Sequence, residues 1–210
     1  MKRLFAIFLL ALAITAYAVF KFKGEMPFTY SVPFGNDTLS MAFHTGWGTD
    51  AVAVGLEEYN KPAIPVDTEG ELVIPDSVVF EGVTAPVRWI SRGSFQSCPK
   101  LTAVRLPKNL KAISDLAFEG CTSLREITFF DSLKVIFPRA FIGCTALRRV
   151  RFQSPTPPAS YGNDTFDEAA YATATLVIPA RWAEAYLSNP LSYRFRYHAE
   201  VIPLYSEVQP

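Results

Sequence analysis

Three cysteines are the side chains in this sequence best suited to chemistry, because a thiol can act as a nucleophile, a redox partner or a metal ligand. Cys98, Cys121 and Cys144 follow one another at equal intervals, two of them within the near-identical strings AFEGCTSL and AFIGCTAL. Adjacent turns of a repeat could bring such thiols within bridging range, but three equivalent sites cannot all pair. The spacing favours buried free thiols that act as small apolar side chains.

The rest of the sequence offers little for catalysis. The chain has two histidines, His44 and His198, and neither lies between the first and the last cysteine, where it could activate a thiol. No nucleophile-elbow, P-loop or zinc-protease string occurs. Asp164, Asp167 and Glu168 could offer oxygens to Ca²⁺, but they lack the spacing of a calcium loop, so a solvated acidic loop is favoured. We therefore predict no catalytic residue, no cofactor and no metal site.

The interval between the cysteines is the period of an internal repeat that would position these side chains. Each copy of this 23-residue repeat contains the pattern L-x-x-V/I-x-L/F, as LTAVRL, LREITF and LRRVRF, which is typical of the strand of a leucine-rich repeat. One such coil cannot bury its own apolar side, so the strands must stack in a parallel ladder. The AFxGC strings would then be return turns, and residues 111–113 and 134–136 a second short strand in each coil. The columns that persist through three copies are Ile90, Ile113 and Ile136; Phe95, Phe118 and Phe141; Cys98, Cys121 and Cys144; Leu101, Leu124 and Leu147; Val104, Ile127 and Val150; and Leu106, Phe129 and Phe152.

This pattern resembles the BspA-type leucine-rich repeat proteins of bacterial cell surfaces, such as those of Bacteroidetes. The similarity covers residues 71–204, from ELVIPDSVVFEGVTAPVRWI, which looks like the family's hairpin entry, to ATLVIPARWAEAYLSNP, which looks like its closing segment. The resemblance implies an α/β solenoid, a short leucine-rich-repeat coil with a parallel strand ladder between a β-rich N-terminal cap and a helix-containing C-terminal cap. It also implies non-enzymatic binding or adhesion, without naming a ligand.

The two ends of the repeat block carry patterns of their own. TLSMAF and AVAVGL alternate apolar and polar residues between glycine-rich breaks, which predicts β-hairpins over the N-terminal cap, residues 26–85. The repeats occupy residues 86–153. In the C-terminal capping segment, residues 154–210, we expect one more strand at residues 176–178 and then a helix from Pro179 to about Leu187, with Trp182 and Tyr186 on one face.

The first residues read as an export signal. Lys2 and Arg3 precede an apolar run from Leu4 to Phe20, and the string AYA ends at Ala18. This layout predicts a signal peptide over residues 1–18, and hence a periplasmic, surface or secreted protein. The alternative is an uncleaved membrane anchor, because the run is close to the shortest length that spans a bilayer.

Charge is divided along the chain although the formal net charge is zero. Residues 24–85 contain one basic and ten acidic residues, whereas residues 86–152 contain twelve basic and four acidic residues. In the strand pattern the x positions face solvent, and nine such positions carry five arginines and one glutamate. They are Thr102, Arg125 and Arg148; Ala103, Glu126 and Arg149; and Arg105, Thr128 and Arg151.

Arginine suits forked recognition of carboxylate, sulfate or phosphate, so this surface is predicted to bind an extracellular protein or an acidic glycan. The candidate contacts are Arg105, Arg125, Glu126, Thr128, Arg148, Arg149 and Arg151. The simpler interpretation is that the arginines only keep an exposed sheet soluble. Export and the lack of interleaved aromatic residues count against nucleic acid.

Two further functions stay open. Trp47, in the string HTGWG, could stack on a sugar ring in a glycan-uptake system. The protein could also be a structural envelope component that binds no soluble ligand.

Overall fold

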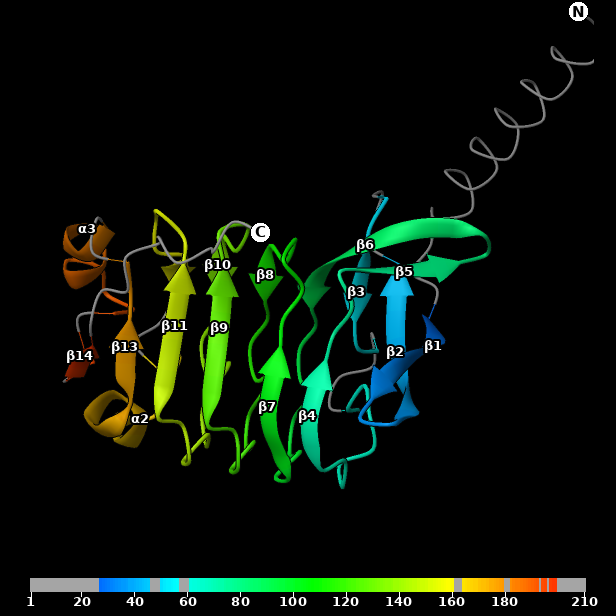
Figure 1. Ribbon diagram of the computed structural model, residues 1–210, viewed down its shortest axis with the longest axis horizontal. Coiled ribbons are helices and arrows are strands. Elements are labelled where there is room, and N and C mark those ends of the chain that lie inside the picture. Colours follow the sequence, from blue (N-terminus) through cyan, green and yellow to red (C-terminus); the bar gives the residue numbers. More distant parts are fainter. Residues whose placement is uncertain are drawn as a thin grey trace, which may run out of the picture.

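The computed structural model describes residues 27–45, 50–56, 61–160, 164–179, 182–192, 194–195 and 197–199 (Figure 1). Two sheets and two short helices make up the regular structure of these residues. The elements, in chain order, are β1 (Pro27–Phe34), β2 (Asp37–Thr45), β3 (Val52–Val54), β4 (Gly70–Val73), β5 (Ser77–Phe80), β6 (Val83–Ile90), β7 (Leu101–Arg105), β8 (Ala112–Ile113), β9 (Glu126–Phe130), β10 (Val135–Ile136), β11 (Arg149–Gln153), β12 (Ala159–Ser160), α2 (Glu168–Thr173), β13 (Thr175–Val177), α3 (Ala183–Leu187) and β14 (Tyr197–Ala199).

One sheet is a ladder of parallel strands in the order β14-β13-β11-β9-β7-β4, which we call the ladder sheet. Figure 1 shows its strands side by side and pointing the same way. Val104, Ile127, Val150 and Leu176 pair in register across four of these strands, as the 23-residue spacing requires for the first three. The parallel ladder fits the solenoid-like fold that the repeat predicts.

The second sheet, the mixed sheet, has the order β1-β2-β3-β6-β8-β10-β12, and β5 pairs with β6. Strands β8 and β10 are the predicted second strand of each coil, reduced to two residues. β1 and β2 pair antiparallel, as predicted for the string TLSMAF. The hairpin of β5 and β6 corresponds to the entry that the family resemblance implied. The predicted boundary between residues 85 and 86 falls inside β6, and β4 already belongs to the ladder sheet.

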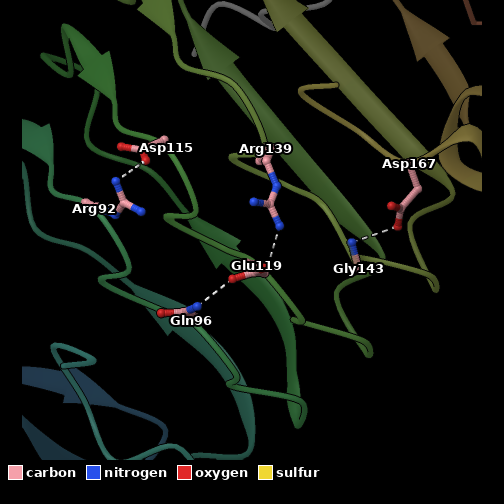
Figure 2. Close-up of polar contacts among 7 residues, drawn as sticks. All are labelled: Arg92, Gln96, Asp115, Glu119, Arg139, Gly143 and Asp167. Atoms are coloured by element: carbon pink, nitrogen blue, oxygen red, sulfur yellow. Dashed lines mark hydrogen bonds and ion pairs between the residues drawn. The ribbon is translucent and has the colours of Figure 1, made fainter. Parts of the chain in front are cut away.

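Return turns form the third side of each coil, and backbone hydrogen bonds join one turn to the next. The N–H groups of Phe95 and Phe118 donate to the carbonyls of Ala117 and Ala140, each over 2.8 Å. Side-chain pairs run along the same side: Arg92 with Asp115 at 2.8 Å, Gln96 with Glu119, and Arg139 with Glu119 at 3.1 Å (Figure 2). Exposed pairs of this kind add little stability, so the backbone bonds and the packing beneath them hold the turns together.

A column of aromatic rings runs through the interior beneath the turns. Phe95, Phe118 and Phe141 are fully buried, and their ring centroids lie 4.9 and 5.0 Å apart in stacked pairs. Phe166 adds a fourth ring 5.1 Å beyond Phe141. This fourth member was not predicted, because it lies two positions beyond the 23-residue step from Phe141. One continuous core cluster extends from Val32 to Phe195.

The chain beyond the last turn agrees in part with the predicted acidic loop, because Asp164 and Asp167 lie outside helices and strands while Glu168 begins helix α2. Residues 168–173 form helix α2, and the carboxylate of Asp167 accepts the N–H of Gly143 at 2.7 Å (Figure 2). In the previous coil the N–H of Gly120 donates to the carbonyl of Ile142 over 2.8 Å. At Gly143 a side-chain oxygen therefore replaces the backbone carbonyl, while the N–H of Phe141 still donates to the carbonyl of Thr165 at 2.9 Å.

Helix α3 begins at Ala183, later than predicted, and its Tyr186 is fully buried. The Tyr186 ring lies 5.1 Å from that of Phe152, and its hydroxyl donates to the carbonyl of Ser154 at 3.1 Å. Trp182 also packs against the core. These contacts fix the helix to the end of the ladder sheet.

The predicted signal peptide lies outside the described residues. Within the described ranges, none of the helices has the length and apolar character needed to cross a bilayer.

Candidate protein-interaction surface

The structure places the seven predicted contact residues on the solvent side of the ladder sheet. All seven lie within β7, β9 and β11 or directly before β9 and β11, and each is exposed or half-buried. Because paired residues on neighbouring parallel strands point the same way, the side chains form rows across the sheet.

Two rows define the candidate site. In the first, which we call the Glu71 row, pairing joins Glu71, Ala103, Glu126, Arg149 and Thr175 in turn. In the second, the Arg105 row, Val73 pairs with Arg105, and Thr128 with Arg151 and then Val177. The pairing of Ala103 with Glu126 sets Arg105 beside Thr128, so the second row is continuous.

Three of the five arginines are already engaged within the protein. Arg149 lies 3.0 Å from a Glu126 carboxylate oxygen, and Arg151 lies 3.7 Å from the other. Arg148 donates to the carbonyls of Thr145 and Leu147 at 3.0 and 2.9 Å. The surface is therefore less uniformly cationic than the sequence predicts.

Arg105 and Arg125 differ from the other three. Within the described part of the chain, neither guanidinium has a hydrogen-bond or ion-pair partner. Both are exposed, so each can bind an external acceptor without first breaking an internal contact.

A groove of about 460 Å³ opens between the two rows. The surface is recessed at Ala103 and Thr128 because these side chains are small. Longer side chains flank each of the two residues along the row to which it belongs. The residues that line it are Glu71, Ala103, Val104, Arg105, Leu106, Glu126, Thr128, Phe130, Arg151 and Gln153. The volume falls in the range of clefts that bind ligands.

Sequence reasoning missed Glu71. This residue pairs with Ala103, and the interval between the two is longer than the 23-residue step of the repeats, so that step does not reach it. The available signal was the apolar alternation of GELVI, which follows the same in-and-out pattern as the later ladder strands. Trp47 lies outside the described residues, so its proposed sugar contact stays a prediction.

The three cysteines are free and fully buried, as predicted. Burial raises the pKa of the Cys98 thiol to about 11 and, with a smaller contribution from Cys98, that of Cys121 to about 12. The Cys121 and Cys144 thiols donate to the carbonyls of Phe95 and Phe118 at 3.2 and 3.3 Å. Because the thiolate is the reactive form, these side chains act as packing groups.

The acidic residues considered for Ca²⁺ have separate contacts. Asp167 accepts the Gly143 N–H, and Glu168 pairs with Arg194. The Asp164 backbone carbonyl accepts the N–H of Arg139 at 3.1 Å. Throughout the described ranges, no three His, Cys, Asp or Glu side chains gather closely enough to hold a metal ion.

One histidine–serine pair was not anticipated. His44 Nε2 lies 2.7 Å from the Ser91 hydroxyl, and its Nδ1 lies 3.3 Å from the Thr45 carbonyl. The neighbouring Gly55 has φ +113° and leaves so little room that a Cβ there would lie 2.5 Å from Ser94 Oγ. This tight packing joins the end of β2 to the first return turn.

Comparison with known proteins agrees with this geometry. Residues 80–180 match the family described as the BspA type leucine rich repeat region, in six copies. Residues 80–180 thus form a BspA-type leucine-rich repeat region, and such repeats are generally non-enzymatic and mediate protein interactions. Searches of curated proteins and of solved structures gave no match to the chain.

Proposed function

We propose that this protein is an exported, non-enzymatic binding protein that recognises a protein partner through the outer face of the ladder sheet, in adhesion at a bacterial surface. The observation that carries the proposal is the groove between the Glu71 row and the Arg105 row. Here the regular repeat presents a depression with charged side chains on both sides.

A sheet of parallel strands suits this role because the backbone positions of its outward residues are fixed. Each strand is bonded to its neighbours and rests on buried side chains such as Ile127 and Val150, which are fully buried. The backbone of this face is therefore preorganised, and binding a partner would cost little backbone conformational entropy. In this proposal β1–β3 and α3 act as caps that close the two ends of the core.

The number of strands limits the expected affinity. The charged rows extend over β4, β7, β9 and β11, so the contact area per partner is small for a protein interface. We expect modest monovalent binding, which clustering of many copies on a surface would strengthen.

Charge reversal on this face should weaken binding selectively. We expect the full chain to bind at least one protein in an array of purified extracellular-matrix proteins, and Arg149→Glu/Arg151→Glu to lower that affinity about tenfold or more, because rim and groove charges are lost together. Binding would be measured by surface plasmon resonance, with circular dichroism to confirm that the variants fold.

Lys111→Glu/Lys134→Glu provides a matched control, because it changes the net charge equally but lies beside β8 and β10 of the mixed sheet. The control should bind like the parent. Equal losses of affinity in both variants would mean that net charge alone causes the effect, and this result would contradict the proposal. Unchanged binding by Arg149→Glu/Arg151→Glu would exclude this face as the binding site.

A further inference from the structure

We propose that the groove on the ladder sheet binds an extended peptide segment of the partner that carries one basic and one acidic side chain two residues apart. The inference rests on the proposed function and specifies the chemistry of its partner. It differs from the anionic partner that the arginine count alone predicts.

The charges around the groove are balanced and sorted by row. Glu71 and Glu126 stand on either side of Ala103, and both are acidic. Arg105 and Arg151 stand on either side of Thr128, and both are basic. The remaining arginines, Arg125, Arg148 and Arg149, are not among the lining residues. The depression therefore presents an acidic half and a basic half, with a net charge of zero.

One residue of each sign is open to a ligand. Glu71 and Arg105 are exposed, and neither side chain has a salt bridge or hydrogen bond to any other residue that the structure describes. A purely anionic ligand would satisfy Arg105 but would meet the carboxylates of Glu71 and Glu126. A purely cationic ligand would satisfy Glu71 but would be repelled by the guanidinium groups of Arg105 and Arg151. Charge complementarity over the whole groove requires a ligand that carries both signs.

The distance between the two halves matches an extended peptide. The rows are two residues apart along each strand, because Ala103 and Arg105 belong to successive outward positions of β7. Two residues of β-strand span about 6.6 Å, and an extended partner presents every second side chain to the same face at the same interval. A segment running along the strands would thus place a basic side chain over the Glu71 row and an acidic one over the Arg105 row, where each faces its complement.

The groove also has room for the two side chains and a place for an apolar contact. Its volume of about 460 Å³ exceeds that of two long side chains but not that of a folded domain. Phe130 is half-buried and lines the groove at the end of β9. It offers a surface for a third, apolar side chain of the segment.

NMR titration of the ¹⁵N-labelled full chain with capped pentapeptides tests this inference, since it detects weak binding and locates it. The probes are Gly-Lys-Thr-Glu-Gly, the same-charge peptides Gly-Glu-Thr-Glu-Gly and Gly-Lys-Thr-Lys-Gly, and Gly-Lys-Glu-Thr-Gly, in which the charges point to opposite faces. We expect the first to bind about fivefold or more tightly than the others, with shifts centred on Ala103 and Thr128.

Charge variants of the protein complete the test. Glu71→Lys and Arg105→Glu should each weaken binding of Gly-Lys-Thr-Glu-Gly about fivefold or more. The exposed residues Asp131 and Lys134 lie outside the groove, so Asp131→Lys and Lys134→Glu should leave it unchanged. The inference is overturned if the mixed-charge peptide binds no more tightly than the same-charge peptides, or if groove and control variants behave alike.

The outcomes separate this inference from the proposed function. Preferential binding of the all-acidic peptide, lost in Arg149→Glu/Arg151→Glu, would overturn the mixed-charge partner while supporting the binding face. Absence of binding by all four peptides would also overturn the inference, and the matrix-protein measurement would then decide the proposed function alone.

Discussion

Replacing Phe118 with alanine should lower the free energy of unfolding by about 3–5 kcal/mol, the range observed for buried aromatic residues truncated in a core. Phe118 is fully buried and stacks on Phe95 at 4.9 Å and on Phe141 at 5.0 Å. The substitution therefore removes the middle ring of the column and leaves a cavity between two coils. Urea unfolding followed by circular dichroism would measure the change.

Val79→Ala is the control for this substitution, because Val79 is an apolar residue that remains 49 % exposed. It should change stability by no more than about 0.5 kcal/mol. A similarly small loss for Phe118→Ala would mean that the aromatic column does not hold the coils together.

Gly143→Ala should destabilise the protein by about 2–5 kcal/mol, through two effects that add. Gly143 has φ +78°, a conformation that costs an L-residue about 1–2 kcal/mol. A Cβ there would also lie 3.0 Å from the backbone nitrogen of Gly120 and 3.1 Å from its Cα. Because the obstacle is backbone, the neighbouring coil must shift, and overpacking of this kind costs about 1–3 kcal/mol.

Gly82→Ala is the control that isolates the conformational cost of an L-residue at positive φ. Gly82 has φ +79°, and a Cβ there would have no atom within 4 Å. It should therefore show only the conformational cost of about 1–2 kcal/mol. Equal losses at Gly82 and Gly143, measured by urea unfolding, would indicate that the turns of successive coils are not in close contact.

The repeat and its interior could be predicted from the sequence because periodicity reports packing directly. Cys98, Cys121 and Cys144 recur at the step that brings them to the same buried position in successive coils. Columns of identical spacing leave little freedom in the register of parallel strands, since one residue of slip would expose every apolar side chain.

The backbone conformation of the return turns could not be predicted from the residue types. Leu116 and Arg139 have φ of 57° and 59°, in the left-handed region that favours glycine, and they repeat the conformation of Gly93 at φ 65°. Nothing in a leucine or an arginine indicates this conformation. The stacking of each turn on the next imposes it, against the preference of the side chain.

The last coil departs from the repeat for a similar reason. Phe166 occupies the next position in the aromatic column, but two additional residues and helix α2 replace the usual return turn. The string FDEAAY carries helix-forming residues, yet six residues are too few to form a stable helix without tertiary contacts. Packing of Tyr171 against Phe166 and Phe195 provides those contacts.

The candidate surface could be predicted only in part. The sequence places five arginines on one face, but their pairing depends on distances between strands. Glu126 engages two of them, and Glu71 reaches the same groove from a strand outside the 23-residue register. Balanced charge in the groove is therefore a property of the assembled sheet.

Disulfide trapping across the groove tests the central claim, that β4, β7, β9 and β11 align their outward residues into two rows. Ala103 pairs directly with Glu126, so the Cα atoms of Ala103→Cys/Glu126→Cys should lie about 4.8 Å apart, within bridging range. Ala103→Cys/Thr128→Cys should place them about 8 Å apart, which is too far. Under mild oxidation, peptide mapping should find the first disulfide and not the second, with the buried native thiols unmodified. Formation of the second disulfide without the first would contradict the register and, with it, the groove.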